Sequence, residues 1–330
     1  MKRNAAQELL LNKQNDDADL PPVRTLKQDV PTRWNSTYLM LKSVFEAHDS
    51  IITVINSNAE TKKKYANMLL VDSKLEIVED LVFLLLPFFQ FTELMSGSKY
   101  VTVSIVIPGV TRLLEILQLF ESKFNNHFIE ELAIEMHNDL EDRTKEYFSN
   151  PLVICATYLD PRYRRFSFVK DDTKRKEFIS KAYSYIKSTF FTKFKVDNEC
   201  EQQMRPPTPK RKRLSKENNF SLCDQNDDTD NVILNEVDAL NTELDNYSKM
   251  KVNVSEESNP LAFYKDNQVL LKRLSQFSKM VFSIMASSTP SEQSFSNAGK
   301  IISIDRNRLN TEHAEELVFI SQNKRLGLIE

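Results

Sequence analysis

Residues 287–323 read SSTPSEQSFSNAGKIISIDRNRLNTEHAEELVFISQN, and this stretch predicts two consecutive helices. Thr289 as a cap, a proline at the first helical position and Glu292 behind them are typical of a helix N-terminus. Asn310 is expected to cap the second helix, whose acidic residues come early and whose basic residues come late, as the helix dipole favours. Residues 317–320 are all apolar and point to all sides of that helix, so we expect protein to enclose them.

The composition extends the helical expectation to the rest of the chain. Only four of the 330 residues are glycine, whereas an average usage of about 7% would give roughly 23. This scarcity argues against glycine-rich phosphate loops, collagen-like repeats and sheets joined by many tight turns. With 41% hydrophobic residues, 28% charged residues and 21 Phe, we predict a mainly α protein with a Phe-rich interior, organised as about two domains or as one domain with an insertion.

The cysteines and histidines predict neither a metal site nor a disulfide framework. Cys155, Cys200 and Cys223 lack CxxC spacing, and no histidine has a cysteine nearby. The apolar stretch from Leu81 to Phe89 is short compared with the ~20 residues of a membrane helix, and the N-terminus lacks a signal-peptide core. We therefore expect no metal, no cofactor and no membrane partner, in an intracellular and reducing compartment.

The first two segments of the chain differ in polarity. Residues 1–28 are polar and are expected to form a disordered N-terminus. Residues 29–196 show helical periodicity almost throughout, and Pro87 is expected to kink or divide a long apolar helix. The run from Val153 to Ala156 is the exception, because its apolar, β-branched character favours an extended strand.

A charge reversal marks the third segment, residues 197–259. The block 205–216 carries basic residues and no acidic ones, whereas the block 217–247 carries acidic residues and no basic ones. Opposite blocks of this kind bury too little apolar surface to offset chain entropy, so we expect a disordered linker with at most a short helix over 232–244. Residues 260–330 are expected to be compact and helical.

Three motifs carry a family resemblance. TRWNSTY at Thr32 to Tyr38, ATYLDPRYRRFSF at Ala156 to Phe168 and the stretch 287–323 resemble motifs of the hAT superfamily of DNA transposases, especially of its BED-type zinc-finger relatives. The last motif is similar to the hAT dimerisation domain. The resemblance implies a helical insertion domain plus a remnant of an RNase H-like α/β core, the remnant lying near residues 29–40, 152–158 and the C-terminal helices.

The resemblance also bears on catalysis, because two Asp and one Glu hold divalent metal ions for strand transfer in that family. Glu292 matches the family Glu, with Gln293 where a basic residue is usual. The two Asp are expected on strands well upstream of the RW motif at Arg33 and Trp34, and the 33 residues before Trp34 contain no strand-like segment. We therefore expect no active metal site and no enzyme, with Glu292 acting as a capping residue.

Two further groups of residues leave alternatives open. Trp34 either packs against a helix start or stacks on a nucleotide, with Arg33 pairing to a phosphate. A basic cluster in the linker is either a nuclear-import signal or solvated charge; it comprises Lys210, Arg211, Lys212 and Arg213.

The apolar residues of the C-terminal motif belong either to the core of this chain or to an interface with a second chain. They are Phe295, Leu317, Phe319 and Ile320. The sequence as a whole favours a nuclear dimerisation module of a domesticated or truncated hAT transposase, forming a homodimer or a heterodimer with related hAT proteins and touching DNA weakly. The alternatives are a DNA transposase fragment and a DNA-binding transcription regulator of the BED-finger type, although a BED finger would need a Cys and His cluster that this sequence lacks.

Overall fold

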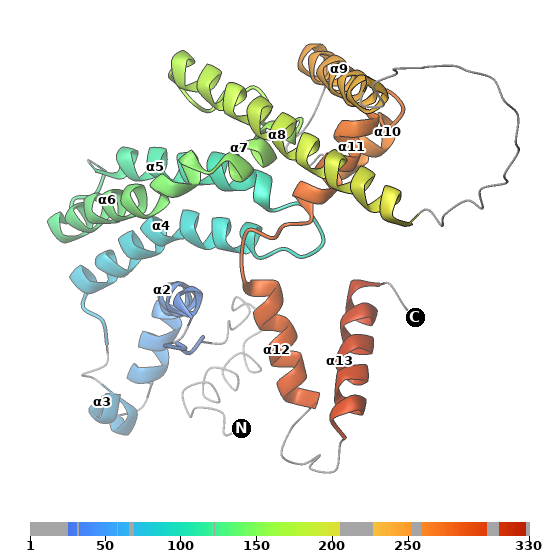
Figure 1. Cartoon of the computed structure of the whole chain (residues 1–330). Coiled ribbons are helices and arrows are strands. Elements are labelled where there is room, and N and C mark those ends of the chain that lie inside the picture. The colour runs from blue at the N-terminus through green and yellow to red at the C-terminus, as the bar shows by residue number, and fades with distance from the viewer. Residues whose placement is uncertain are drawn as a thin grey trace, which may run out of the picture. The chain divides into compact units, whose positions relative to one another are not determined.

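The computed structural model describes residues 26–31, 33–57, 59–65, 69–121, 123–204, 227–252, 259–301 and 310–327. Within these ranges every regular element is a helix and no strand occurs (Figure 1). This confirms the mainly α prediction. The chain divides into two compact units, one made of Met1–Leu94 with Arg112–Thr144 and the other of Met95–Thr111 with Lys145–Glu330.

The first unit is built from long amphipathic helices. Its buried cluster contains Leu84, Leu117 and Ile129, and Tyr38 stacks on Phe89 with ring centroids 4.6 Å apart. The helices that lie in it wholly or for the most part are α2 (Trp34–Asn56), α3 (Ala59–Tyr65), α4 (Asp72–Met95), α5 (Val106–Phe120) and α6 (His127–Ser149).

Helix α4 is not divided by its proline. It runs from Asp72 to Met95 with Pro87 inside, so one of the two outcomes expected for that residue does not occur. Tertiary packing around a long apolar helix offsets the cost of an internal proline, because the lost hydrogen bond is a small part of the energy gained by burial.

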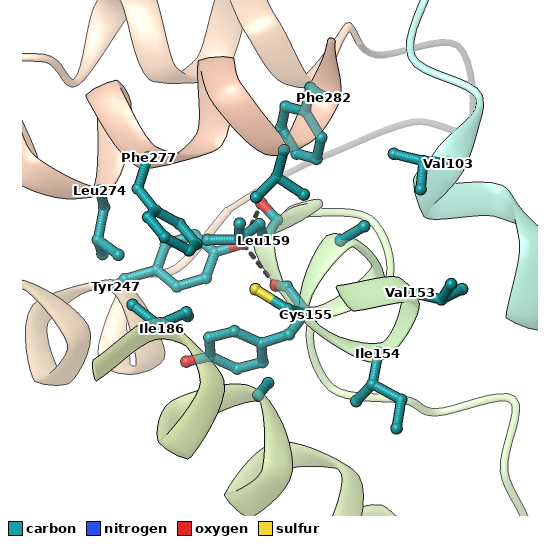
Figure 2. Close-up of a cluster of buried hydrophobic side chains, with 14 of the residues drawn as sticks. Val103, Val153, Ile154, Cys155, Leu159, Ile186, Tyr247, Leu274, Phe277 and Phe282 are labelled. Carbon is teal, nitrogen blue, oxygen red and sulfur yellow. Dashed lines mark hydrogen bonds between the residues drawn. The ribbon is translucent and has the colours of Figure 1, made fainter. Parts of the chain in front are cut away.

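The second unit surrounds one buried helix. Its elements are η2 (Val103–Ile105), α7 (Pro151–Leu159), α8 (Asp172–Met204), α9 (Asp227–Lys249), α10 (Pro260–Asp266), α11 (Lys272–Phe282), α12 (Thr289–Ile301) and α13 (Thr311–Leu326). Figure 2 shows the side chains of α7 in contact with those of α8, α9 and α11. Cys155 and Leu159 of α7 lie close to Ile186, Tyr247 and Leu274 in this core.

The extended run predicted from Val153 to Ala156 was wrong, because these residues lie inside α7. Pro151 occupies the first turn, and the Asn150 side chain accepts a hydrogen bond from the backbone N–H of Leu152 at 3.0 Å, which caps the helix. Residues 153–159 are all buried. A short apolar run buried on all sides has no amphipathic period, so its sequence does not distinguish a strand from a helix.

The predicted disordered linker also requires correction, because α8 extends to Met204 and residues 227–249 form α9. Leu240, Leu244 and Tyr247 recur at helical spacing on one face of α9 and are buried in the core. Asp238 and Asp245 occupy exposed positions of the same helix, so the excess of acidic residues concealed an amphipathic pattern. The basic cluster Lys210 to Arg213 and residues 1–25 lie outside the described residues.

One described stretch, Val103–Phe120, is long and apolar enough by composition to cross a membrane. Half of it is buried inside the protein, including Ile107 and Leu117. The core helix of a folded domain has the same property, so the composition of this stretch is weak evidence of a membrane span.

Candidate functional site

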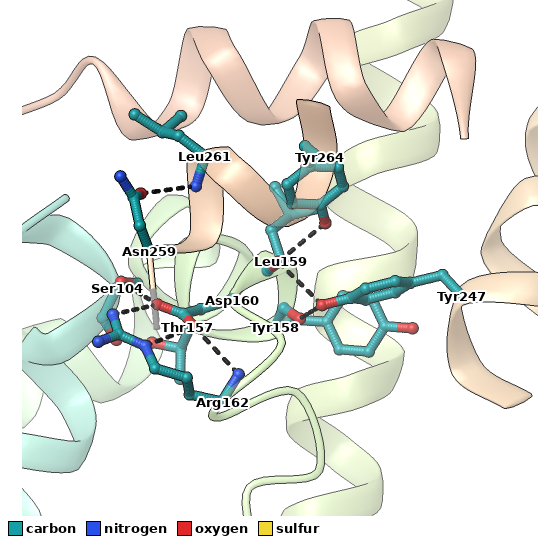
Figure 3. Close-up of polar contacts among 10 residues, drawn as sticks. All are labelled: Ser104, Thr157, Tyr158, Leu159, Asp160, Arg162, Tyr247, Asn259, Leu261 and Tyr264. Atoms are coloured by element: carbon teal, nitrogen blue, oxygen red, sulfur yellow. Dashed lines mark hydrogen bonds and ion pairs between the residues drawn. The ribbon is translucent and has the colours of Figure 1, made fainter. Parts of the chain in front are cut away.

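The turn that follows α7 contains a buried acid whose hydrogen bonds are provided by its neighbours (Figure 3). The Asp160 carboxylate accepts hydrogen bonds from Ser104 Oγ at 2.7 Å and from Arg162 Nε and Nη2 at 2.9 and 2.7 Å. Because a buried charge is costly unless it is paired and hydrogen-bonded, this bidentate pair allows a carboxylate inside the core. The LDPR motif therefore encodes a fixed, polar turn.

Two tyrosines from later helices bind the end of α7. Tyr247 Oη donates to the carbonyl oxygens of Leu159 at 2.8 Å and Tyr158 at 3.1 Å, and Tyr264 Oη donates to that of Leu159 at 2.8 Å. The last carbonyls of a helix have no partner within the helix, so these hydroxyls satisfy them. Burial raises the pKa of both hydroxyls well above the ordinary value, which keeps them protonated as donors.

Two sets of hydrogen bonds attach the C-terminal half of α9 to the rest of the unit. Arg164 donates to the carbonyl oxygens of Tyr247 and Met250, at the C-terminal end of the helix where cations are favoured. One helical turn before Tyr247, the buried Glu243 accepts hydrogen bonds from the backbone N–H groups of Arg273 at 2.8 Å and Leu274 at 3.0 Å. Glu243 thus caps the N-terminus of α11 from a different helix. Sequence reasoning missed this role, because a capping residue is sought next to the helix that it caps.

Trp34 and Arg33 lie at the start of α2. Trp34 is the first helical residue and is 43% exposed, and Arg33 precedes it as the N-cap. Asp29 supports this helix start by accepting hydrogen bonds from Ser36 Oγ at 2.6 Å and Thr37 Oγ1 at 3.0 Å, and these bonds lower the pKa of the Asp29 carboxyl. Asn35 lies inside the helix. A nucleotide-stacking role for Trp34 stays a prediction.

Glu292 lies in the first turn of α12, where it is exposed and accepts a hydrogen bond from Ser288 Oγ at 2.7 Å. At the same helix start, Ser287 Oγ accepts a hydrogen bond from the backbone N–H of Thr289 at 3.0 Å. Across the part of the chain that the structure describes, no three His, Cys, Asp or Glu side chains come together in a way that suits a metal ion. The capping role of Glu292 stays a prediction.

Helices α12 and α13 pack against each other, and their large apolar side chains remain exposed. Ala314 is buried, and α13 ends at Gly327, whose φ of 73° is a left-handed conformation that glycine adopts without strain. The exposed apolar residues are Phe295 at 77%, Phe319 at 69%, Ile320 at 49% and Leu317 at 39%. We call these four residues the hairpin surface. The structure places them outside the buried clusters of both units.

Comparison with known proteins gives this arrangement a family context. Residues 243–324 match the hAT family C-terminal dimerisation region, and residues 1–81 match the ZBED1 RNase-like helical domain. The chain is therefore related to the hAT transposases and to their BED-type zinc-finger relatives, and it carries their dimerisation region.

Three relatives are similar along most of this chain. A Zea mays protein named as an AC transposase is 26% identical, with 92% of this chain and 37% of the relative covered. A second Zea mays protein, named as an AC9 transposase, is also 26% identical, with 92% and 38% covered. Zinc finger BED domain-containing protein 4 of Homo sapiens is 24% identical, with 92% and 24% covered. The chain thus spans between about a quarter and two fifths of the length of these relatives.

Proposed function

We propose that this chain associates with a second copy of itself, or with a related hAT chain, through the hairpin surface of α12 and α13. The single observation that carries the proposal is the exposure of Phe295 and Phe319 inside the matched dimerisation region. Exposed apolar clusters of this kind are typical of protein interfaces, where aromatic residues supply much of the binding energy.

The energy available at this surface suffices for a specific complex. A fully buried Leu, Ile or Phe side chain contributes about 1.5–3 kcal/mol relative to an exposed one. At about 100° per residue, Ile320 lies about 60° from Leu317 and about 100° from Phe319 around the axis of α13. A symmetric dimer would use each buried side chain twice, so these residues together offset the several kcal/mol of association entropy.

The matched region contributes to the interior as well as to association. Glu243, Tyr247 and Leu274 lie inside it, and all three are buried in the second unit. Its last two helices carry the most exposed phenylalanines among the described residues of the region, although Val269 and Leu270 before α11 and Ile284 and Met285 after it are exposed as well. We therefore assign α9 to α11 to the fold of the single chain and α12 with α13 to association.

The test compares two charged substitutions of exposed phenylalanines. Phe319→Glu places a charge on the hairpin surface, whereas Phe128→Glu changes a Phe that is 60% exposed on α6, outside the matched dimerisation region. Size-exclusion chromatography with light scattering at tens of micromolar measures the mass. We expect a dimer for the unsubstituted chain and for Phe128→Glu, and a monomer for Phe319→Glu.

Two results would refute this assignment. One is a monomeric unsubstituted chain at that concentration that also fails to bind a related hAT chain. The other is a Phe319→Glu variant that keeps the dimer mass while its circular dichroism matches that of the parent chain. The double variant Phe319→Glu with Phe295→Glu tests the rest of the hairpin surface in the same assay. A dimer mass for this double variant also contradicts the assignment.

The proposal extends to location and chemistry. We propose a nuclear protein, supported by the basic cluster from Lys210 to Arg213 and by relatives named as transposases and as a BED zinc-finger protein.

We also propose that this chain contributes association and not metal-dependent strand transfer, with Glu292 as part of the start of α12. Magnesium-dependent nicking of DNA that is abolished by Glu292→Ala would refute the second statement and favour a transposase fragment. Duplex affinity lost on neutralising Lys210 to Arg213 would favour the DNA-binding regulator.

A further inference from the structure

A basic pocket lies beside the turn that follows α7, in the second unit. It has a volume of about 330 Å³, which is within the usual range for small-ligand sites. Among the described residues that line it, four are cationic and none is acidic, and Ser167 also belongs to the lining. The cationic residues are Arg162, Arg164, Arg165 and Lys251.

Two of the four cationic side chains already bind other groups of the protein, and the other two can bind a ligand. Arg162 is bound to Asp160, and Arg164 is bound to the carbonyl oxygens at the end of α9. Arg165 and Lys251 are exposed, and no hydrogen bond or ion pair joins either of them to another described residue. Asp160 neutralises the charge of Arg162, so the described lining keeps an excess of positive charge from the other three cations.

The backbone of this turn is held in place by the core. Phe166 follows Arg165 and has a φ of 48°, a left-handed conformation that is unfavourable for a residue other than glycine. Its ring is buried and contacts the ring of Phe178 at a centroid distance of 5.3 Å. Packing of the ring therefore fixes the turn, and strained backbone fixed in this way is often found at ligand sites.

We propose that this pocket binds a phosphate group, with Arg165 and Lys251 as the binding residues and with Arg162 and Arg164 setting the positive potential. Arginine forks and a hydroxyl donor suit the tetrahedral oxygens of phosphate, and a preformed basic concavity concentrates anions. Two sources share this chemistry, namely the backbone of a nucleic acid and a free phosphate or phosphate ester.

The experiment uses the full chain and two matched double variants. Arg165→Ala with Lys251→Ala removes the available charges, whereas Lys265→Ala with Lys279→Ala removes the same charge from exposed positions on α10 and α11. Fluorescence anisotropy with a labelled DNA duplex gives Kd as a function of salt. Competition with inorganic phosphate at constant ionic strength then distinguishes the two sources.

We expect the pocket variant to weaken duplex binding about a hundredfold, since it removes two charged groups and a hydrogen bond to a charged group contributes on the order of one decade of affinity. The slope of log K against log salt should fall by about 2, because each neutralised phosphate contributes roughly 0.9. The control variant should change the slope by less than half as much. Displacement by millimolar phosphate assigns the pocket to free phosphate groups, and resistance assigns it to the nucleic-acid backbone.

Three outcomes would overturn the site. They are a parent chain that binds neither the duplex nor inorganic phosphate, a pocket variant that binds both as the parent does, and a control variant that weakens binding as much as the pocket variant. Both substituted pairs are exposed, so circular dichroism is expected to show an unchanged fold in each case. The result is independent of the association proposal, because Phe319→Glu leaves the pocket intact.

Discussion

Glu243→Ala tests whether α9 is an integral part of the fold. The Glu243 carboxylate, which is buried, accepts three hydrogen bonds, two from backbone N–H groups at the start of α11 and one from Arg273 Nη1 at 3.0 Å. Alanine leaves the N–H of Leu274 without its acceptor inside the core. Arg273 loses one of its two acidic partners but keeps Glu236, whose Oε2 lies 2.7 Å from Arg273 Nε.

The expected cost follows from these contacts. Loss of a helix cap costs about 1 kcal/mol and up to about 2, and removing one partner of the largely buried charged hydrogen bond between Arg273 and Glu243 adds about 1 kcal/mol. We therefore expect Glu243→Ala to lower the free energy of unfolding by about 2–3 kcal/mol, or Tm by about 5–10 °C for a unit of this size. Glu243→Gln keeps an acceptor oxygen and should cost about 1 kcal/mol.

Urea unfolding of the full chain, followed by circular dichroism, measures these differences. Glu236→Ala is the matched control, because Glu236 binds the same arginine from a more exposed position and should cost no more than about 1 kcal/mol. If Glu243→Ala cost no more than Glu236→Ala, the cap on α11 would carry no energy. Residues 227–249 would then behave as the dispensable linker that their charge pattern suggested.

Three further predictions concern the second unit. The hydrogen bond from the Arg273 side chain lowers the pKa of Glu236 below its ordinary value of 4.5. The Glu236–Arg273 pair therefore stabilises the fold above that pH, and this stabilisation is lost as the pH falls through the lowered pKa. The stability that Glu236→Gln loses at pH 7 should therefore shrink in urea titrations as the pH is lowered below 4.5. Burial raises the pKa of the Cys155 thiol, so iodoacetamide at about pH 8 should leave it unmodified in the native chain and modify it after unfolding, as read by peptide mass spectrometry. A fragment limited to residues 243–324 lacks α7 and should show no cooperative thermal transition, whereas the full chain should show one.

The sequence predicted the helices whose ends carry polar signals. Helices α12 and α13 begin where the polar signals predicted, although Thr289 is the first helical residue and not the cap, and the Asn310 side chain makes no capping hydrogen bond. The sequence failed where burial decides the structure. Helix α7 is enclosed on all sides and has no period to detect, and α9 has its apolar residues spaced among enough acidic ones to resemble a linker.

The residues of the candidate site also fall into those that the sequence could indicate and those that only the structure shows. Phe295 and Phe319 could be named from the sequence as core or interface, but only their exposure separates the two alternatives. Ser104 as a partner of Asp160 and Leu274 as a partner of Glu243 could not be named, because each pair is separated by more than 25 residues. Contacts at such separation depend on the tertiary arrangement and leave no spacing in the sequence.

If the proposed association holds, the matched dimerisation region combines two physical roles in a single chain. Tyr247 and Tyr264 satisfy the end of α7 with their hydroxyls, and Glu243 caps α11, so the first half of the region completes a core that residues outside it begin. The second half of the region, α12 and α13, comes after Ala286 in the chain. The backbone N–H of Ala286 donates to Thr102 Oγ1 at 3.1 Å, which attaches this point of the chain to the second unit. An association surface presented by α12 and α13 is fixed to the rest of the unit only when α7 and α9 are packed. Loss of the Glu243 cap should therefore weaken association indirectly, whereas Phe319→Glu should abolish it without lowering the stability of the fold.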